Sequence, residues 1–147
     1  MTATPLSFHT KRRVEFRDTD AAGIVHFSAF FVYMEQAEHE LLRSLGLSVA
    51  AQDDAGEIGW PRIAATCEFL SPARFEEVLD VEVLVERLGR KSVTYTFSFT
   101  RDGTPIARGS TTAVCCRIRS GLPPQSMEIP AWFSHQLRSL RRAGTAP

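Results

Sequence analysis

Hydrophobic positions along the 147-residue chain change their spacing in a way that separates one helix from several strands. From Phe27 to Leu45 the apolar residues follow helical spacing, and further apolar positions widen the stripe beyond what a surface helix needs. Gly46, directly after this stretch, is a typical helix stop. The pattern predicts a long helix that other elements cover on most sides. Its apolar positions are Phe27, Phe30, Phe31, Val32, Tyr33, Met34, Ala37, Leu41, Leu42 and Leu45.

Runs in which apolar and polar residues alternate predict strands on both sides of this helix. In the clearest run Val81, Val83 and Val85 share one face. Ser92 to Thr100 alternates as well, and Asp102-Gly103 after it is a strong signal for a tight turn. The predicted strands are Phe8 to Phe16 (with Val14 and Phe16 on one face), Trp60 to Leu70, Val78 to Leu88, Ser92 to Thr100 and Pro105 to Ile118.

The remaining segments are predicted as loops and a second helix. Ser48 to Gly59 is interpreted as a loop with a short helical turn at Val49 to Ala51. Ala131 to Arg142 is predicted to be a C-terminal helix, with Pro130 near its start. We expect the residues up to Pro5 and the tail after the second helix to be flexible.

The order of these elements indicates the fold class. One strand, one long buried helix and four strands in meander order are typical of an α+β protein with an antiparallel sheet. The chain length favours a single domain over residues 1–147, with a core of about residues 8–134.

Composition and charge exclude several classes of protein. Lys plus Arg and Asp plus Glu both number 17, so the formal net charge of zero argues against a general nucleic-acid binder. No apolar run approaches the roughly 20 residues of a membrane span, and Met1 to Thr10 lacks the apolar core of a secretory signal. Cys67, Cys115 and Cys116 form no CxxC pair and are expected to be reduced thiols. We therefore expect a cytoplasmic protein without a metal site, since the histidines are scattered too.

An acidic turn, DTDAAG at residues 18–23, comes directly before the predicted helix. Asp is favoured in such turns and at helix starts for structural reasons. The residue types alone therefore leave a capping role and a chemical role open for Asp18 and Asp20.

The segment from Asp18 to Val25, followed by an aromatic-rich helix with Glu35, resembles the hotdog-fold acyl-CoA thioesterases of the 4-hydroxybenzoyl-CoA thioesterase and YbgC-like type. Gly89-Arg90-Lys91-Ser92 resembles the turn between two long strands in the same family. The resemblance spans about Phe8 to Ser134. It implies a five-stranded antiparallel sheet wrapped around one long central helix, with a short C-terminal helix in addition. It also implies a homo-oligomer, a dimer or homotetramer, with active sites at the interface.

The resemblance also implies how thioester hydrolysis is performed. Asp20 matches the family's catalytic aspartate, which acts as nucleophile or general base, and no Gly-x-Ser-x-Gly elbow competes with it. Gly23 permits the close approach of a ligand, and the backbone amide of Phe27 is expected to polarise the thioester carbonyl. His26 stands one position before the histidine of many YbgC-like members, so we expect a pocket-wall or hydrogen-bonding role for it.

Other residues are expected to bind or to support. Arg90, Lys91 and Ser92 are candidates for the phosphates of coenzyme A, although a solvated hairpin end explains them equally well. Asp18 is expected to be structural, and Glu35 to make a structural hydrogen bond to the turn beneath it, since a buried carboxylate needs a partner. The acyl pocket is expected to involve Phe30, Phe31, Met34, Trp60 and Pro61.

Three alternatives to an acyl-CoA thioesterase stay open. The substrate could be an acyl-carrier-protein thioester. A hydratase or dehydratase would need His26 or His39 together with Glu35, and a non-catalytic acyl-CoA-binding module would make Asp20 dispensable. The expected reaction needs no metal or redox cofactor, and the expected partners are acyl-CoA and further copies of the chain. The acyl group, whether aromatic, dihydroxynaphthoyl or aliphatic, is left open.

Overall fold

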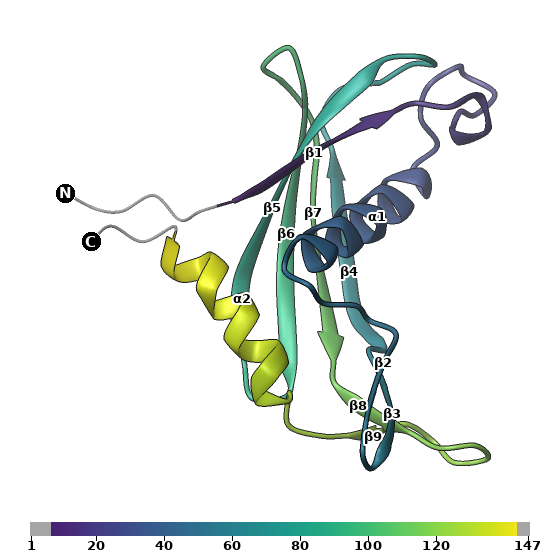
Figure 1. Cartoon of the computed structure of the whole chain (residues 1–147). Coiled ribbons are helices and arrows are strands. Elements are labelled where there is room, and N and C mark those ends of the chain that lie inside the picture. The colour runs from purple at the N-terminus through teal and green to yellow at the C-terminus, as the bar shows by residue number, and fades with distance from the viewer. Residues whose placement is uncertain (1–6, 144–147) are drawn as a thin grey trace.

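The main sheet is five-stranded and antiparallel, and α1 (Ala29–Ser44) lies across one of its faces (Figure 1). The computed structural model describes residues 7–143, so the segments predicted to be flexible, residues 1–5 and 144–147, lie outside it. α1 contacts β1, β5, β7 and β4 and buries the face turned to the sheet, but its opposite face is open and Val32, predicted to belong to the covered stripe, is 53% exposed. The strand order is β1 (Phe8–Arg13), β5 (Val78–Leu88), β6 (Ser92–Arg101), β7 (Thr104–Val114) and β4 (Arg62–Phe69).

A second, smaller sheet lies beyond the C-terminal end of α1 (Figure 1). It is formed by β2 (Ala51–Asp53), β3 (Gly56–Gly59), β8 (Cys116–Ile118) and β9 (Gln125–Ser126). The short 3₁₀ helix η1 (Phe16–Asp18) precedes α1, and α2 (Ala131–Ala143) packs against β5. The predicted α+β class, the strand-wrapped helix and the C-terminal helix are confirmed.

The core lies between α1 and the inward faces of β5 and β6. Val81, Val83 and Val85 are buried together, as the alternation predicts. The helix comes very close to β7 at Gly109, where a Cβ atom would meet the sulfur of Met34 at 2.6 Å. Glycine is therefore required at this position so that α1 can pack closely against the sheet.

Two turn predictions are confirmed by backbone geometry. Asp102 and Gly103 have φ angles of 49° and 81°, which suit the tight turn that joins β6 to β7. Gly46 has a φ angle of 74° and follows the end of α1.

Several predicted boundaries are wrong. The first strand ends at Arg13, and Phe16, predicted to share the buried face of Val14, lies exposed in η1. The last strand is broken at Cys115, whose N–H donates to the carbonyl of Lys91 as the chain passes from the main sheet to the smaller one.

The predicted loop from Ser48 to Gly59 contains the β2–β3 hairpin, and Val49 to Ala51 is not helical. The acidic turn residues suggested a loop, but pairing with β8 stabilises strands on both sides of that turn. Among the described residues, no helix is long and apolar enough to cross a membrane.

Candidate active site

Asp20 lies in a tight loop between η1 and α1. Its N–H donates to the carbonyl of Ile24 at 2.8 Å, and its own carbonyl accepts from the N–H of Gly23 at 2.9 Å. The carboxylate oxygen Oδ1 accepts from the N–H of Ala22 at 2.8 Å. No described residue donates to Oδ2, so one carboxylate oxygen is left for a ligand or a water molecule. Gly23 makes this loop possible, since its φ angle is 78°.

An apolar pocket of about 470 Å³ opens beside Asp20. It lies between the start of α1 and the end of β4, and the N–H of Val25 joins the two sides by donating to the carbonyl of Ala73 at 2.8 Å. Asp20 is the one ionisable side chain of the lining. The other lining residues are Ile24, Val25, Phe27, Phe30, Phe69, Leu70, Ser71, Pro72 and Ala73.

Phe27 lines this pocket. The ring is 61% exposed and stacks on the ring of His26 with centroids 4.5 Å apart. Within the described part of the chain, no group accepts a hydrogen bond from the amide of Phe27. His26 does not line the pocket, but its expected hydrogen-bonding role is seen, since its Nδ1 accepts from the N–H of Ser28 at 3.2 Å. The backbone N–H of Phe27 is therefore available to donate to a ligand.

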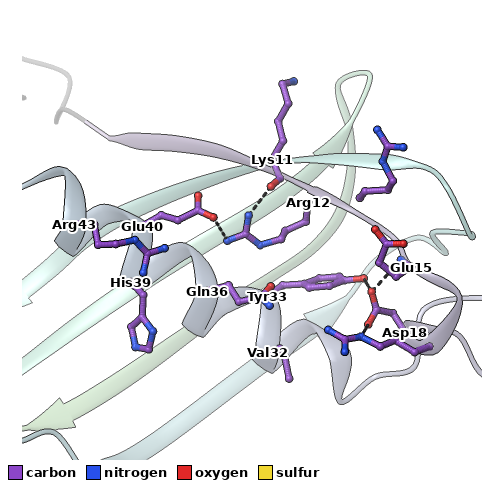
Figure 2. A pocket seen from close by; sticks show the side chains of 12 residues that line it. Lys11, Arg12, Glu15, Asp18, Val32, Tyr33, Gln36, His39, Glu40 and Arg43 are labelled. Atoms are coloured by element: carbon purple, nitrogen blue, oxygen red, sulfur yellow. Dashed lines mark hydrogen bonds and ion pairs between the residues drawn. The ribbon is translucent and has the colours of Figure 1, made fainter. Parts of the chain in front are cut away.

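The two acids expected to be structural differ in their surroundings. The Oδ2 atom of Asp18 accepts hydrogen bonds from the hydroxyl of Tyr33 at 2.7 Å and the N–H of Glu15 at 3.0 Å (Figure 2). Glu35 is 58% exposed and forms an ion pair with Arg62 at 3.5 Å, in place of the expected hydrogen bond to the turn beneath.

Sequence reasoning missed the acid of α1 that is buried, which is Glu38. Its side chain is only 2% exposed, and it accepts bidentate hydrogen bonds from Arg62 at 2.5 and 2.7 Å. Its spacing of four residues from Met34 and three from Leu41 on the covered stripe was a signal that could have identified it.

The expected coenzyme A residues lie at the other end of the sheet. Arg90, Lys91 and Ser92 form the turn after β5, whereas Asp20 lies near the segment that leads into β5. The 11 residues of β5 separate these ends by roughly 35 Å. Arg90 is 81% exposed and pairs with Glu128. One chain by itself therefore does not bring this turn to Asp20.

Of the residues expected around the acyl group, Phe30 lines the pocket and the others do not. Met34 is fully buried in the core, and Phe31 is partly buried against it. The ring of Trp60 lies 4.7 Å from that of Phe133 on α2. The carbonyl of Pro61 accepts from the N–H of Val114 in β7.

The pocket wall from Phe69 to Ala73 was missed, because the sequence was interpreted there as a strand end and a turn. The adjacent apolar pair Phe69-Leu70 beside Pro72 was the available signal, and both side chains are exposed in the structure. No cluster of three or more potential metal ligands occurs among the described residues.

Comparison with known proteins identifies the class of this protein. The model of the Thioesterase-like superfamily matches residues 14–137, which includes the Asp20 loop, α1 and the whole main sheet after β1. The chain therefore belongs to the thioesterase-like superfamily, and the expected class of enzyme, a thioester hydrolase, is confirmed.

Relatives of known activity cover most of the chain. The 1,4-dihydroxy-2-naphthoyl-CoA hydrolase of Thermosynechococcus vestitus is 30% identical over 137 residues, which are 90% of this chain and 92% of the relative. The 4-hydroxybenzoyl-CoA thioesterase of a Pseudomonas strain is 29% identical over 97 residues, or 65% and 69% of the two chains. The solved 1,4-dihydroxy-2-naphthoyl-CoA thioesterase of Synechocystis has a TM-score of 0.81 at 23% identity and covers 91% of this chain and 97% of its own. This last likeness confirms the fold.

Proposed function

We propose that this protein hydrolyses an acyl-CoA thioester to a carboxylic acid and free coenzyme A, with Asp20 as the catalytic carboxylate. The observation that carries the proposal is the free Oδ2 atom of Asp20 in an apolar pocket that is also lined by Phe27, whose backbone amide is unpaired among the described residues. A base or nucleophile and a donor for the developing oxyanion are the two groups that thioester hydrolysis requires.

Two routes satisfy this geometry. As a general base, Asp20 takes a proton from water while the water oxygen attacks the thioester carbon; collapse of the tetrahedral intermediate breaks the C–S bond, and the thiolate of coenzyme A takes up the proton. As a nucleophile, Asp20 forms a mixed anhydride, expels the thiolate and is released by water. In both routes the amide of Phe27 stabilises negative charge on the carbonyl oxygen.

The acyl group is proposed to lie against Phe27, Phe30 and Phe69, because these side chains give the pocket its apolar surface. Relatives named for 1,4-dihydroxy-2-naphthoyl-CoA and 4-hydroxybenzoyl-CoA support coenzyme A as the leaving group. We propose no metal or redox cofactor, since a carboxylate and an amide donor suffice for this hydrolysis. Free cysteines fit the proposed cytoplasmic location.

The active unit is proposed to be at least a dimer that pairs through β4. This strand is at one edge of the main sheet, and its Ile63 and Phe69 are 65% and 51% exposed. An apolar edge strand invites pairing with a second strand. A second copy would extend the pocket wall at Phe69, and it is the way in which a distant turn such as Arg90-Lys91-Ser92 can reach a bound coenzyme A.

The test is a thiol-release assay on the purified protein with benzoyl-, hydroxybenzoyl-, dihydroxynaphthoyl-, short-chain and long-chain acyl-CoA, run in water labelled with oxygen-18. We expect turnover on at least one ester, one labelled oxygen in the acid product and an unchanged rate after treatment with EDTA. Release of thiol from acyl-carrier-protein esters alone would overturn the coenzyme A assignment. Hydration of an enoyl ester without thiol release would indicate a hydratase, and tight binding without any turnover would indicate a binding module.

A further inference from the structure

Tyr33 of α1 reaches from the core to the loop that carries Asp20. Its side chain is 3% exposed, and its hydroxyl donates to Oδ2 of Asp18 at 2.7 Å. Figure 2 shows the ring lying between β1 and α1, with the hydroxyl directed at the carboxylate. The pair forms part of a second pocket, of about 460 Å³, which Asp20 does not line. Tyr33 therefore contacts the loop at Asp18, in a pocket separate from the one that Asp20 lines.

Asp18 connects this contact to both halves of the active site. Its Oδ2 also accepts from the N–H of Glu15 at 3.0 Å, which closes the turn that leads to Asp20. Its carbonyl accepts from the N–H of His26 at 2.7 Å, one residue before Phe27. An isolated antiparallel β-bridge between Thr19 and Val25 joins the same two segments. The backbone at Asp18 thus fixes the segment that leads to the Asp20 carboxylate. It holds this segment in place relative to the segment at His26, which leads to the unpaired amide of Phe27.

The chemistry of the hydrogen bond between Tyr33 and Asp18 suits a contact that holds the loop in one position. Burial of the Tyr33 hydroxyl, together with its hydrogen bond to Asp18, raises its pKa, so the hydroxyl stays protonated and remains a donor. Hydrogen bonds to a charged acceptor are shorter and stronger than neutral ones. Removal of the hydroxyl leaves the Asp18 carboxylate with one donor fewer in a partly buried position.

We propose that Tyr33 is a positioning residue, which acts through Asp18 to hold the Asp20 carboxylate and the Phe27 amide at their working separation. The inference rests on the proposed function of the Asp20 site. Neither Tyr33 nor Asp18 touches the substrate in this account, so their loss affects the chemical step more than substrate binding.

The test compares Tyr33→Phe with Tyr95→Phe. Tyr95 is also 3% exposed, and no described residue forms a hydrogen bond with its hydroxyl, so it controls for the loss of a hydroxyl from a buried tyrosine. We expect Tyr33→Phe to lower kcat about tenfold with KM changed less than about twofold, because a small misplacement of reacting groups costs this much. Tyr95→Phe should leave both constants within about twofold of the wild type.

A double-mutant cycle and amide chemical shifts make the test independent of substrate choice. Asp18→Ala should lower kcat at least as much as Tyr33→Phe does, since it also removes the acceptor of the Glu15 N–H, and adding Tyr33→Phe to it should lower kcat no further. The amide resonances of residues 20–27 should move in Tyr33→Phe and stay in place in Tyr95→Phe. An unchanged kcat or unchanged resonances in Tyr33→Phe would overturn the inference. Loss of the proposed function is distinguishable from this, because it would show as a lack of wild-type turnover on every thioester.

Discussion

At the scale of single residues, the conformation of Gly23 decides where the Asp20 carboxylate points. The positive φ angle of this glycine closes the hydrogen bond to the Asp20 carbonyl and turns the chain toward Ile24. In that conformation the side chain of any L-residue is strained. The position therefore links backbone sterics directly to the geometry of the proposed catalytic carboxylate.

Gly23→Ala tests this link. We expect the free energy of unfolding to fall by about 1 kcal/mol and kcat to fall at least about tenfold, because the strained loop shifts Asp20. Gly121→Ala is the matched control, since Gly121 has a φ angle of 76° and lies outside the pocket. It should show a similar loss of stability, measured by urea unfolding, with normal kcat. Equal kcat values for both variants would contradict the role of Gly23.

The sequence predicts the site residues that lie close together along the chain better than those that only the fold brings together. Residues 18–27 form the loop through hydrogen bonds within a few positions, so a local motif predicts that Asp20, Gly23 and Phe27 lie together. The wall from Phe69 to Ala73 joins them only through tertiary pairing with Val25 and Ile24, which no local pattern contains.

At the scale of elements, α1 is fixed to the sheet by charged contacts on two sides. Toward β4, Glu38 accepts two hydrogen bonds from Arg62. Toward β1, Glu40 accepts a hydrogen bond from Thr10 and pairs with Arg12 at 2.6 Å. The helix therefore combines an apolar contact with the sheet and polar contacts at both borders.

Arg62→Met leaves the carboxylate of Glu38 buried without its partner. We expect the free energy of unfolding to fall by about 3 kcal/mol, whereas the double variant Glu38→Leu/Arg62→Met should recover most of that loss. Arg108→Met, which breaks an exposed pair with Glu68, should cost less than about 1 kcal/mol. Equal losses in Arg62→Met and Arg108→Met, measured by urea unfolding, would contradict the account.

The contact of Glu40 with β1 predicts a pH dependence. Burial alone raises the pKa of Glu40, but hydrogen bonds from Thr10 and Arg12 and the charge of Arg12 outweigh it and lower this pKa below its ordinary value. A lowered pKa in the folded state means stabilisation that is present above the ordinary Glu pKa and lost as pH falls through the folded value.

The wild-type free energy of unfolding should therefore decline as pH falls below about 4.5, and Glu40→Gln should show a weaker decline. Glu35→Gln, which removes an exposed carboxylate from the same helix, is the control and should decline as the wild type does. Urea unfolding at pH 3 to 7 measures the effect. Parallel curves for the wild type and Glu40→Gln would refute the assignment.

The helices and strands were predictable where the apolar residues keep one regular spacing over a long segment. In β5 and β6, apolar and polar residues alternate because one face of each strand is covered. In α1, the apolar residues follow helical spacing because one face of the helix is covered. The β2–β3 hairpin and the break at Cys115 were not predictable, because a second small sheet outside the main one stabilises them. The start of α1 at Ala29 also follows from the loop geometry, which keeps Phe27 out of the helix.

At the scale of the whole molecule, the two edges of the main sheet are unequal. Both edge strands contact α1, but the exposed side chains of β1 are His9, Lys11 and Arg13, whereas β4 presents the apolar Ile63 to solvent. The unequal edges favour association through β4, beside the pocket that Phe69 and Asp20 line.

Ile63→Glu should separate the proposed dimer. We expect the dissociation constant, measured by analytical ultracentrifugation, to rise at least about 100-fold, because a charge placed in an apolar contact loses burial and remains unpaired. Activity should fall at concentrations at which the variant is monomeric. Leu122→Glu is the control, since Leu122 is 63% exposed but lies away from β4. A monomeric wild type with full activity would contradict the proposal.

The most direct test of the central claim is the rate of thiol release by Asp20→Asn on the best acyl-CoA substrate. Asp54→Asn, in the exposed turn of the β2–β3 hairpin, serves as the control. We expect Asp20→Asn to lower kcat about 1,000-fold while affinity for coenzyme A changes less than about twofold, and Asp54→Asn to behave as the wild type. An Asp20→Asn variant that keeps more than about a tenth of the wild-type kcat would show that another group performs the hydrolysis.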